Sequence, residues 1–203
     1  MQAIVEMVVQ GGVGAQRGRP PAGPPAPSGR RVVRDGQEWL VHTRHVRAVP
    51  GSVWSALTRP DRLDQWVGTW HPRADSTVEF LLTHEGDDVL PIVYGIEAVS
   101  PGRSFSVSVR APDGAGPAHV AVELTPAGVG AAAGTLVTLA HTVGDRALAP
   151  YLATGAEFYL DRLVAVLEGL RTPHPVDFDE YFVRQAPHYR RLFPTQRDGR
   201  LDG

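Results

Sequence analysis

The sequence contains no cysteine. Disulfide bonds, thiolate-ligated zinc and a cysteine nucleophile are therefore excluded. The sequence also has no apolar run approaching the roughly 20 residues that a membrane-spanning helix needs. Residues 1–10 have no basic start and carry Glu6 inside their apolar stretch, which is unlike a secretory signal. We therefore expect a cytoplasmic protein that does not bind membranes.

An excess of charge of one sign is also missing. The chain has 20 Lys and Arg against 22 Asp and Glu, with a formal net charge of -2. Domains that bind nucleic acids usually carry a clustered basic patch, and none stands out here. A nucleic-acid partner is therefore not expected. Hydrophobic residues make up 42% and charged residues 21% of the chain, which is typical of a globular domain.

Motifs for catalysis or cofactor binding are absent as well. There is no GxSxG motif, phosphate loop or dinucleotide-binding fingerprint. The glycine-rich residues 11–14 follow no plausible strand and precede prolines. His84, His119 and His141 do not have the spacing of a metal site. We therefore expect no cofactor and no metal, assign no catalytic residue, and favour a protein that is not an enzyme.

The composition divides the chain into three parts. Eleven of the nineteen residues from 11 to 29 are Gly or Pro, and such a segment has little apolar surface to bury. We therefore predict a disordered extension over residues 1–36, followed by one domain over 37–171. Residues 172–203 form a C-terminal extension, in which Pro187 is expected to separate two short helical pieces. Its five aromatic residues either pack on the domain or form a homodimer contact.

Within residues 37–171, the hydrophobic pattern changes period along the chain. Alternation with period two predicts strands over 38–47, 76–84, 89–99, 104–110, 119–124 and 135–143, separated by turn residues. Two short helices are expected after the first strand, one capped by Ser52 and one opened by Pro60. Residues 149–170 follow a helical period. The prediction is an α+β fold in which a curved antiparallel sheet of six to seven strands wraps around a long C-terminal helix.

Particular motifs make the fold prediction more specific. Residues 53–58 (VWSALT) and 60–63 (PDRL), followed by Trp66, resemble the VWxALTxPxxLxxW segment of the START-like (SRPBCC) superfamily. More narrowly, they resemble its Hsp90-ATPase-activator-homologue branch. Residues 134–139 (GTLVTL) and 155–163 are similar to a strand and a helix of that branch, and the resemblance covers roughly 37–171. It implies a helix-grip fold with a cavity between helix and sheet.

Departures from the family pattern bear on that cavity. The family carries Trp where this chain has Ala156, so the resemblance implies an enlarged cavity here. Residues 66–68 (WVG) stand where the family usually has Trp-Trp-Gly. The family's early Gly-Gly turn is missing, and the region after Trp70 is shorter than in the family by about one strand. Family members typically use the cavity for small apolar ligands, and some relatives are polyketide cyclases or aromatases.

Candidate ligand-binding residues follow from this expected cavity. The strand residues expected in its wall are Phe105, Val107, Val120 and Val122, and the helix residues are Leu152, Ala156, Tyr159 and Leu163. Trp66 and Trp70 are candidates for a lid, whereas Trp54 is expected to be core. Tyr94 and Tyr159 either reach a ligand carbonyl or place their hydroxyls at the rim of the core.

His42 and Arg44 share one strand face with two apolar residues. If that face points inward, they orient a ligand or form an acid–base pair with a carboxylate such as Glu97. The alternatives are that they pair with acidic residues for structural reasons, or that the strand has the opposite phase.

Together these observations predict a protein that binds a small hydrophobic molecule. One alternative is a cyclase or aromatase, which requires two or more polar side chains converging inside the cavity. The other is a protein-interaction module such as a co-chaperone, which requires a filled core and an exposed apolar patch.

Overall fold

The computed structural model describes residues 24–83, 90–110, 117–174 and 177–195. In chain order the elements are β1 (Arg30–Arg34), β2 (Gln37–Val46), α2 (Pro50–Thr58), α3 (Pro60–Leu63), β3 (Thr69–Pro72), β4 (Thr77–Leu81), β5 (Ile92–Ser100), β6 (Ser104–Arg110), β7 (Pro117–Ala127), the 3-10 helix η1 (Gly130–Ala132), β8 (Gly134–Thr142), α4 (Ala149–Glu168) and α5 (Phe178–Leu192). The predicted α+β class, with two short helices after an early strand and a long C-terminal helix, is confirmed.

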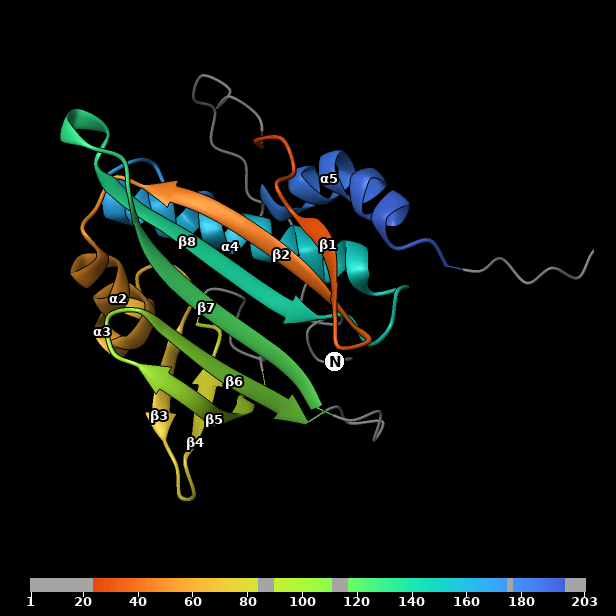
Figure 1. The fold of residues 1–203 in the computed structure, drawn as a ribbon, viewed down its shortest axis with the longest axis horizontal. Helices are drawn as coiled ribbons and strands as arrows, with labels where there is room; N and C mark the ends of the chain where they lie inside the picture. Colours follow the sequence, from red (N-terminus) through yellow and green to blue (C-terminus); the bar gives the residue numbers. More distant parts are fainter. Residues whose placement is uncertain (1–23, 84–89, 111–116, 175–176, 196–203) are drawn as a thin grey trace, which may run out of the picture.

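The strands form one antiparallel sheet in the order β1-β2-β8-β7-β6-β5-β4-β3. The sheet curves around α4, which lies behind β2 and β8 in Figure 1, while α5 lies beside β1. Helices α2 and α3 cover one end. Strands β3 to β8 follow one another across the sheet as a meander, and β2 pairs with β8 on its other side. The strands expected over 76–143 therefore lie side by side in sequence order.

The sheet has eight described strands, more than the six to seven expected, and the first of the additional strands is β1. Its residues pair with β2 from Arg30↔Val41 to Arg34↔Gln37. Asp35 and Gly36 connect the two strands with φ of 51° and 76°, the positive φ values of a two-residue hairpin turn. The expected domain start at residue 37 is therefore too late, and the expectation of disorder is wrong for 30–36. Residues 1–23 lie outside the described part.

The second additional strand is β3, which pairs with β4 through Trp70↔Phe80. It has four residues and ends at Pro72, too short to produce a recognisable alternation. The turn expected at Ser100–Gly102 is confirmed, since Gly102 adopts a φ of 76°. The turns expected at 87–88 and 112–114 lie outside the described residues.

The short helices both begin with proline. Helix α3 begins at Pro60 as expected, but α2 begins at Pro50, and no side chain caps it. The Ser52 cap is therefore wrong: the fixed φ of Pro50 suits a first helical position, so the helix starts three residues earlier, with Val49 in the N-cap position. The indole N–H of Trp66 donates to the Ala56 carbonyl at 2.9 Å, which ties the chain after α3 back to α2.

The C-terminal extension packs on the domain. Phe178, Tyr181, Tyr189 and Phe193 are all buried within the chain, which fits the first of the two alternatives for its aromatic residues. Helix α5 runs without a break through Pro187, so the expected division into two pieces is wrong. Pro187 lies on the exposed side of α5, where water can satisfy the carbonyl that loses its partner. No described helix is long and apolar enough to cross a membrane.

Candidate functional site

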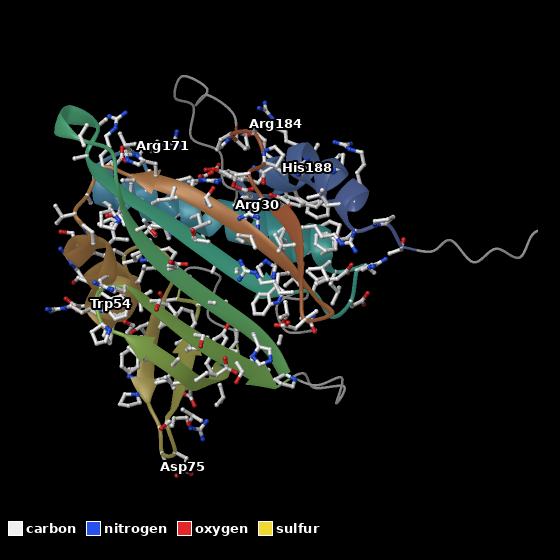
Figure 2. The ribbon with its side chains drawn as sticks, viewed as in Figure 1. Arg30, Trp54, Asp75, Arg171, Arg184 and His188 are labelled. Atoms are coloured by element: carbon white, nitrogen blue, oxygen red, sulfur yellow. The ribbon has the colours of Figure 1, made fainter. Side chains whose placement is uncertain are left out.

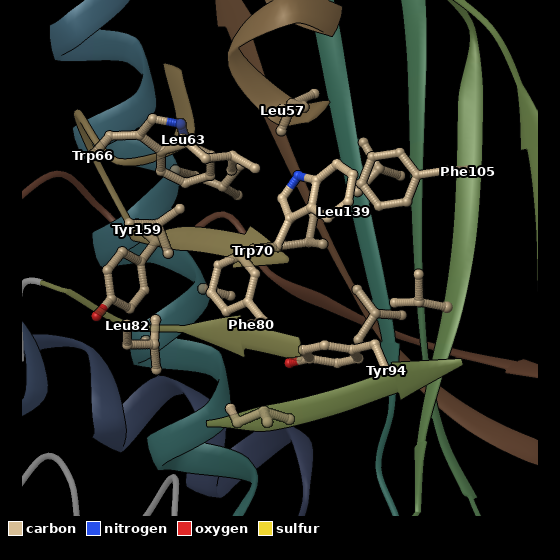
Figure 3. Close-up of a pocket in the computed structure, with 18 of the residues that line it drawn as sticks. Leu57, Leu63, Trp66, Trp70, Phe80, Leu82, Tyr94, Phe105, Leu139 and Tyr159 are labelled. Carbon is tan, nitrogen blue, oxygen red and sulfur yellow. The ribbon is translucent and has the colours of Figure 1, made fainter. Parts of the chain in front are cut away.

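A cavity of about 800 Å³ lies between α4 and the inner face of the sheet. Figure 3 shows its aromatic lining, with Trp66 and Leu63 near one end. The lining residues are Trp54, Leu57, Thr58, Leu63, Trp66, Val67, Trp70, Val78, Phe80, Leu82, Ile92, Tyr94, Ile96, Val99, Phe105, Val107, Val120, Val122, Val137, Leu139, Tyr151, Leu152, Gly155, Ala156, Phe158, Tyr159, Leu160 and Phe178. They come from the six strands β3 to β8, from the segment that contains α2 and α3, from α4 and from the start of α5.

The sheet side of the cavity follows from register and period two. Val107 lies opposite Val120, and Val122 lies opposite Leu139. Residues directly opposite each other in an antiparallel pair share a face, and alternate residues along a strand share it too. The inner face from β6 to β8 is therefore apolar, while the serines at 104, 106 and 108 occupy the outer face of β6.

Two small residues lie in the middle of the helix side of the cavity. Gly155 and Ala156 of α4 both line the cavity. A Cβ placed on Gly155 would meet no atom within 4 Å. Space is therefore open next to the middle of α4, where larger side chains would pack on the sheet.

Aromatic rings give the cavity much of its surface. Trp54 meets Phe105 edge-on with ring centroids 6.1 Å apart, and Phe80 meets Tyr94 in the same way at 6.1 Å. Such edge-to-face pairs favour one ring orientation over others. Trp54, which was expected to be wholly core, is thus part of the cavity wall; Figure 2 shows it on α2.

The polar content of the cavity is small. None of the described lining residues carries a charge. The indole N–H of Trp70 donates to the Thr58 carbonyl at 2.9 Å, so this residue presents only ring carbon to the cavity. Burial raises the pKa of Tyr94 to about 12, so that its hydroxyl is neutral over the physiological range.

The cavity is accessible from β5. Ile96 and Val99 line it and are also 39% and 53% exposed. No other described lining residue is as exposed, so the partly open cavity is most exposed along this strand.

The structure brings together ten of the thirteen predicted ligand-binding residues. Those that line the cavity are Trp66, Trp70, Tyr94, Phe105, Val107, Val120, Val122, Leu152, Ala156 and Tyr159. Leu163 is fully buried in the core instead. The remaining two, His42 and Arg44, lie elsewhere. Val137 and Leu139 also line the cavity and were missed, although the alternation in 135–143 contained the signal.

His42 and Arg44 face α4 at a point where the helix closes directly on the sheet. The Nδ1 atom of His42 is 3.3 Å from Oε1 of Glu157. Arg44 forms ion pairs with Glu157 and, at 2.7 Å, with Asp161. The inward strand phase expected for β2 is therefore present, but the acidic partners come from α4. Glu97, the expected partner, instead contacts His119 at 2.8 Å.

Glu157 is the centre of this second group, which we call the Glu157 cluster: Ser28, Gly29, His42, Arg44, Glu157, Asp161 and Tyr189. The Glu157 side chain is fully buried. It accepts hydrogen bonds from the backbone N–H groups of Ser28 at 2.6 Å and Gly29 at 3.0 Å, and from the Tyr189 hydroxyl. The cluster therefore joins the segment before β1, β2, α4 and α5.

Electrostatics in the cluster hold Glu157 ionised. Burial alone would raise the pKa of Glu157, but the His42 hydrogen bond and the Arg44 charge outweigh it, and its pKa lies well below the usual range. For Asp161, burial outweighs the charge of Arg44 and raises the pKa. A carboxylate that is charged, buried and fully paired is well suited to a structural role.

A pair of histidines lies next to the cluster. The rings of His42 and His141 stack with centroids 5.8 Å apart, and the Nε2 atom of each is buried without a partner in the described chain. Burial and the nearby His42 lower the pKa of His141 to about 3. The described residues contain no group of three or more side chains that could hold a metal ion.

Solved structures resemble this fold over most of the chain. CalU16 from Micromonospora echinospora is 21% identical, with a TM-score of 0.62, over 82% of this chain and 96% of that protein. A conserved protein of unknown function from Enterococcus faecalis is 15% identical, with a TM-score of 0.60, over 81% and 91%. The Aha1 dimer from Colwellia psychrerythraea is 18% identical, with a TM-score of 0.51, over 64% and 96%. No curated protein matches the sequence significantly.

A sequence model of one family covers more than half of the chain. The family described as "Activator of Hsp90 ATPase homolog 1-like protein" matches residues 47–168. This range runs from just after β2 to the end of α4, and so includes every described cavity-lining residue except Phe178 of α5. The chain therefore belongs to the Activator of Hsp90 ATPase homolog 1-like family, within the START-like superfamily that its helix-pair motif resembled.

Proposed function

We propose that this protein binds a small hydrophobic molecule in the cavity between the sheet and α4. The observation that carries the proposal is the size and chemistry of the cavity: about 800 Å³, with an almost wholly apolar lining. Sites for drug-sized ligands are roughly 300–1,000 Å³ and mostly apolar. An apolar cavity tends to stay dry and to accept an apolar guest.

The two alternatives are less well supported. A cyclase or aromatase requires polar side chains that converge inside the cavity, whereas the described lining offers tyrosine hydroxyls and no carboxylate or imidazole. His42 and Arg44, the polar pair expected for this role, are engaged by Glu157 on another face of α4. An interaction module requires a filled core, which a cavity of this size argues against. The aromatic residues of α5 are buried in the chain, so a dimer contact through them has little support.

The test is a substitution that fills the cavity. Ala156→Trp places a large side chain where the small Ala156 lines the cavity. We expect it to weaken binding of the neutral fluorescent probe N-phenyl-1-naphthylamine by at least about tenfold, or about 1.4 kcal/mol. Stability should stay the same or rise, because the new side chain enters existing space.

A matched control is Val183→Trp, which adds the same side chain at a position on α5 that is 74% exposed. Probe binding should be unchanged in this variant. If Ala156→Trp binds the probe as well as the unmodified protein, or if it unfolds the domain, the cavity is not the binding site.

A further inference from the structure

The cavity contains a hydroxyl group whose hydrogen-bonding capacity is not used by any residue in the described part of the chain. Tyr94 of β5 lies opposite Val78 on one side and Val109 on the other, which places its ring on the inner face. Its edge-on contact with Phe80 orients the ring. Figure 3 shows the Tyr94 hydroxyl directed across the cavity toward α4. Among the described residues, nothing donates to it or accepts from it.

Most of the other polar groups of the lining are already satisfied or point elsewhere, and the Tyr151 ring at the start of α4 stacks on Phe182 of α5. The Thr58 hydroxyl donates to the Trp54 carbonyl at 2.8 Å, and both lid tryptophans donate to backbone carbonyls. In Figure 3 the Tyr159 hydroxyl points away from Phe80 and the centre of the cavity. Tyr94 is therefore the best-placed donor for a bound molecule.

Charge is excluded from the same space. The described lining has no cationic side chain. The buried cations of β2 and α4 are engaged elsewhere: Arg44 is held by Glu157 and Asp161, and Arg162 donates to the carbonyls of Trp66 and Pro173. Moving a carboxylate from water into an apolar site without a cation costs far more than a hydrogen bond returns. A neutral polar group, in contrast, needs only one partner to offset its desolvation.

We propose that Tyr94 determines the specificity of the cavity by donating a hydrogen bond to a carbonyl or similar uncharged oxygen of a neutral, otherwise apolar ligand. This inference rests on the proposed function and adds the ligand class: neutral ketones, quinones or esters, rather than fatty acids and other carboxylates.

The experiment compares two neutral probes. The first, 6-propionyl-2-(dimethylamino)naphthalene, carries a ketone whose hydrogen bonding moves its emission to longer wavelength. The second, N-phenyl-1-naphthylamine, has no oxygen. We expect Tyr94→Phe to raise the Kd of the ketone probe about fivefold, or about 1 kcal/mol, the size of one net hydrogen bond. Its bound emission should shift to shorter wavelength, and binding of the second probe should be unchanged.

Tyr159→Phe is the matched control, because it removes a tyrosine hydroxyl from the opposite wall. It should leave both probes and the ketone emission unchanged. A second comparison uses 2-acetylnaphthalene and 2-naphthoate, which have similar shapes, to displace N-phenyl-1-naphthylamine at neutral pH. We expect the carboxylate to bind at least about tenfold more weakly.

The outcomes separate the two proposals. If N-phenyl-1-naphthylamine binds but Tyr94→Phe changes neither the Kd nor the emission of the ketone probe, the role of Tyr94 is wrong and the proposed function stands. Equal binding of 2-naphthoate and 2-acetylnaphthalene would overturn the neutral-ligand class. If neither probe binds the unmodified protein, the proposed function itself fails.

Discussion

The carboxylate of Glu157 accepts a hydrogen bond of 3.0 Å from the backbone N–H of Gly29, across 128 residues of sequence. The contact places the segment before β1 against the middle of α4. The carbonyl of the same glycine is 3.2 Å from Nε2 of His188 on α5, which Figure 2 shows beside the start of β1. These contacts leave no space for a side chain at position 29.

Gly29→Ala should lower the free energy of unfolding by about 1–3 kcal/mol. The added Cβ would lie 2.7 Å from ring atoms of both His42 and Tyr189, so the Glu157 cluster would have to move. Chemical denaturation measures the change. Gly51→Ala in α2 is the control, because its Cβ would meet nothing within 4 Å. Equal effects of the two substitutions would contradict the packing around Gly29.

Two truncations test where the folded unit begins. A chain starting at residue 24 keeps Ser28 and Gly29 and should be as stable as the full chain. A chain starting at residue 30 loses both backbone donors to Glu157 and the Pro25 carbonyl that accepts from Gln185. Because the buried Glu157 carboxylate loses partners, the free energy of unfolding of this shorter chain should be lower by about 2–5 kcal/mol, measured by thermal or chemical unfolding. Similar stability of the two truncations would show that this segment contributes little.

Glu157→Gln should destabilise the protein by about 3–5 kcal/mol at pH 7, since Arg44 loses a buried partner. The pKa of Glu157 is lowered in the folded state, so its contribution to stability is present above the ordinary value of about 4.5 and is lost as the pH falls below it. The deficit of the variant should therefore shrink as the pH is lowered from 5 toward 3, as measured by unfolding curves at each pH.

Asp161→Asn provides the contrast to Glu157→Gln. The pKa of Asp161 is raised by burial, so the stability linked to its protonation is present at low pH and is lost as the pH rises through the folded-state pKa. The deficit of this variant should not shrink on acidification. Parallel behaviour of the two variants would mean that the two carboxyls do not differ as described.

Gly155→Ala should raise the free energy of unfolding by about 0.5–1 kcal/mol. Glycine inside a helix is less favourable than alanine by about that amount, and a Cβ at this position meets open space. Differential scanning calorimetry should show a higher Tm. Gly68→Ala should have the opposite effect, because Gly68 has a φ of 153° and its Cβ would lie 2.0 Å from the Leu81 carbonyl oxygen. A loss of stability in Gly155→Ala would argue that the cavity is filled.

Part of the cavity wall could be predicted from sequence because it depends on local periodicity. The alternation in 104–110 and 119–124 fixed which residues share a face, and the helical period in 149–170 selected residues such as Ala156 and Tyr159. Both patterns record burial on one side of an element. Packing between residues far apart in the sequence then only had to bring these faces together.

The Glu157 cluster was beyond such reasoning. Glu157 lies in the helix predicted over 149–170, and a charged side chain in an amphipathic helix is usually exposed. Its burial depends on donors that are 115 and 128 residues away, His42 and Gly29. The segment that carries Gly29 was assigned to a disordered extension by composition, although the Asp35-Gly36 turn was a hairpin signal. Long-range polar pairing leaves no periodic trace in a sequence.

Helix α4 meets polar partners on one side and empty space on another. Glu157 and Asp161 anchor it to β2 and α5 through charged and hydrogen-bonded contacts, while Gly155 and Ala156 face the cavity. The position of the helix therefore does not depend on filling that space. Side chains along the cavity can therefore change in size without loss of the polar contacts that hold the helix, so the volume of the cavity and the stability of the fold can vary independently.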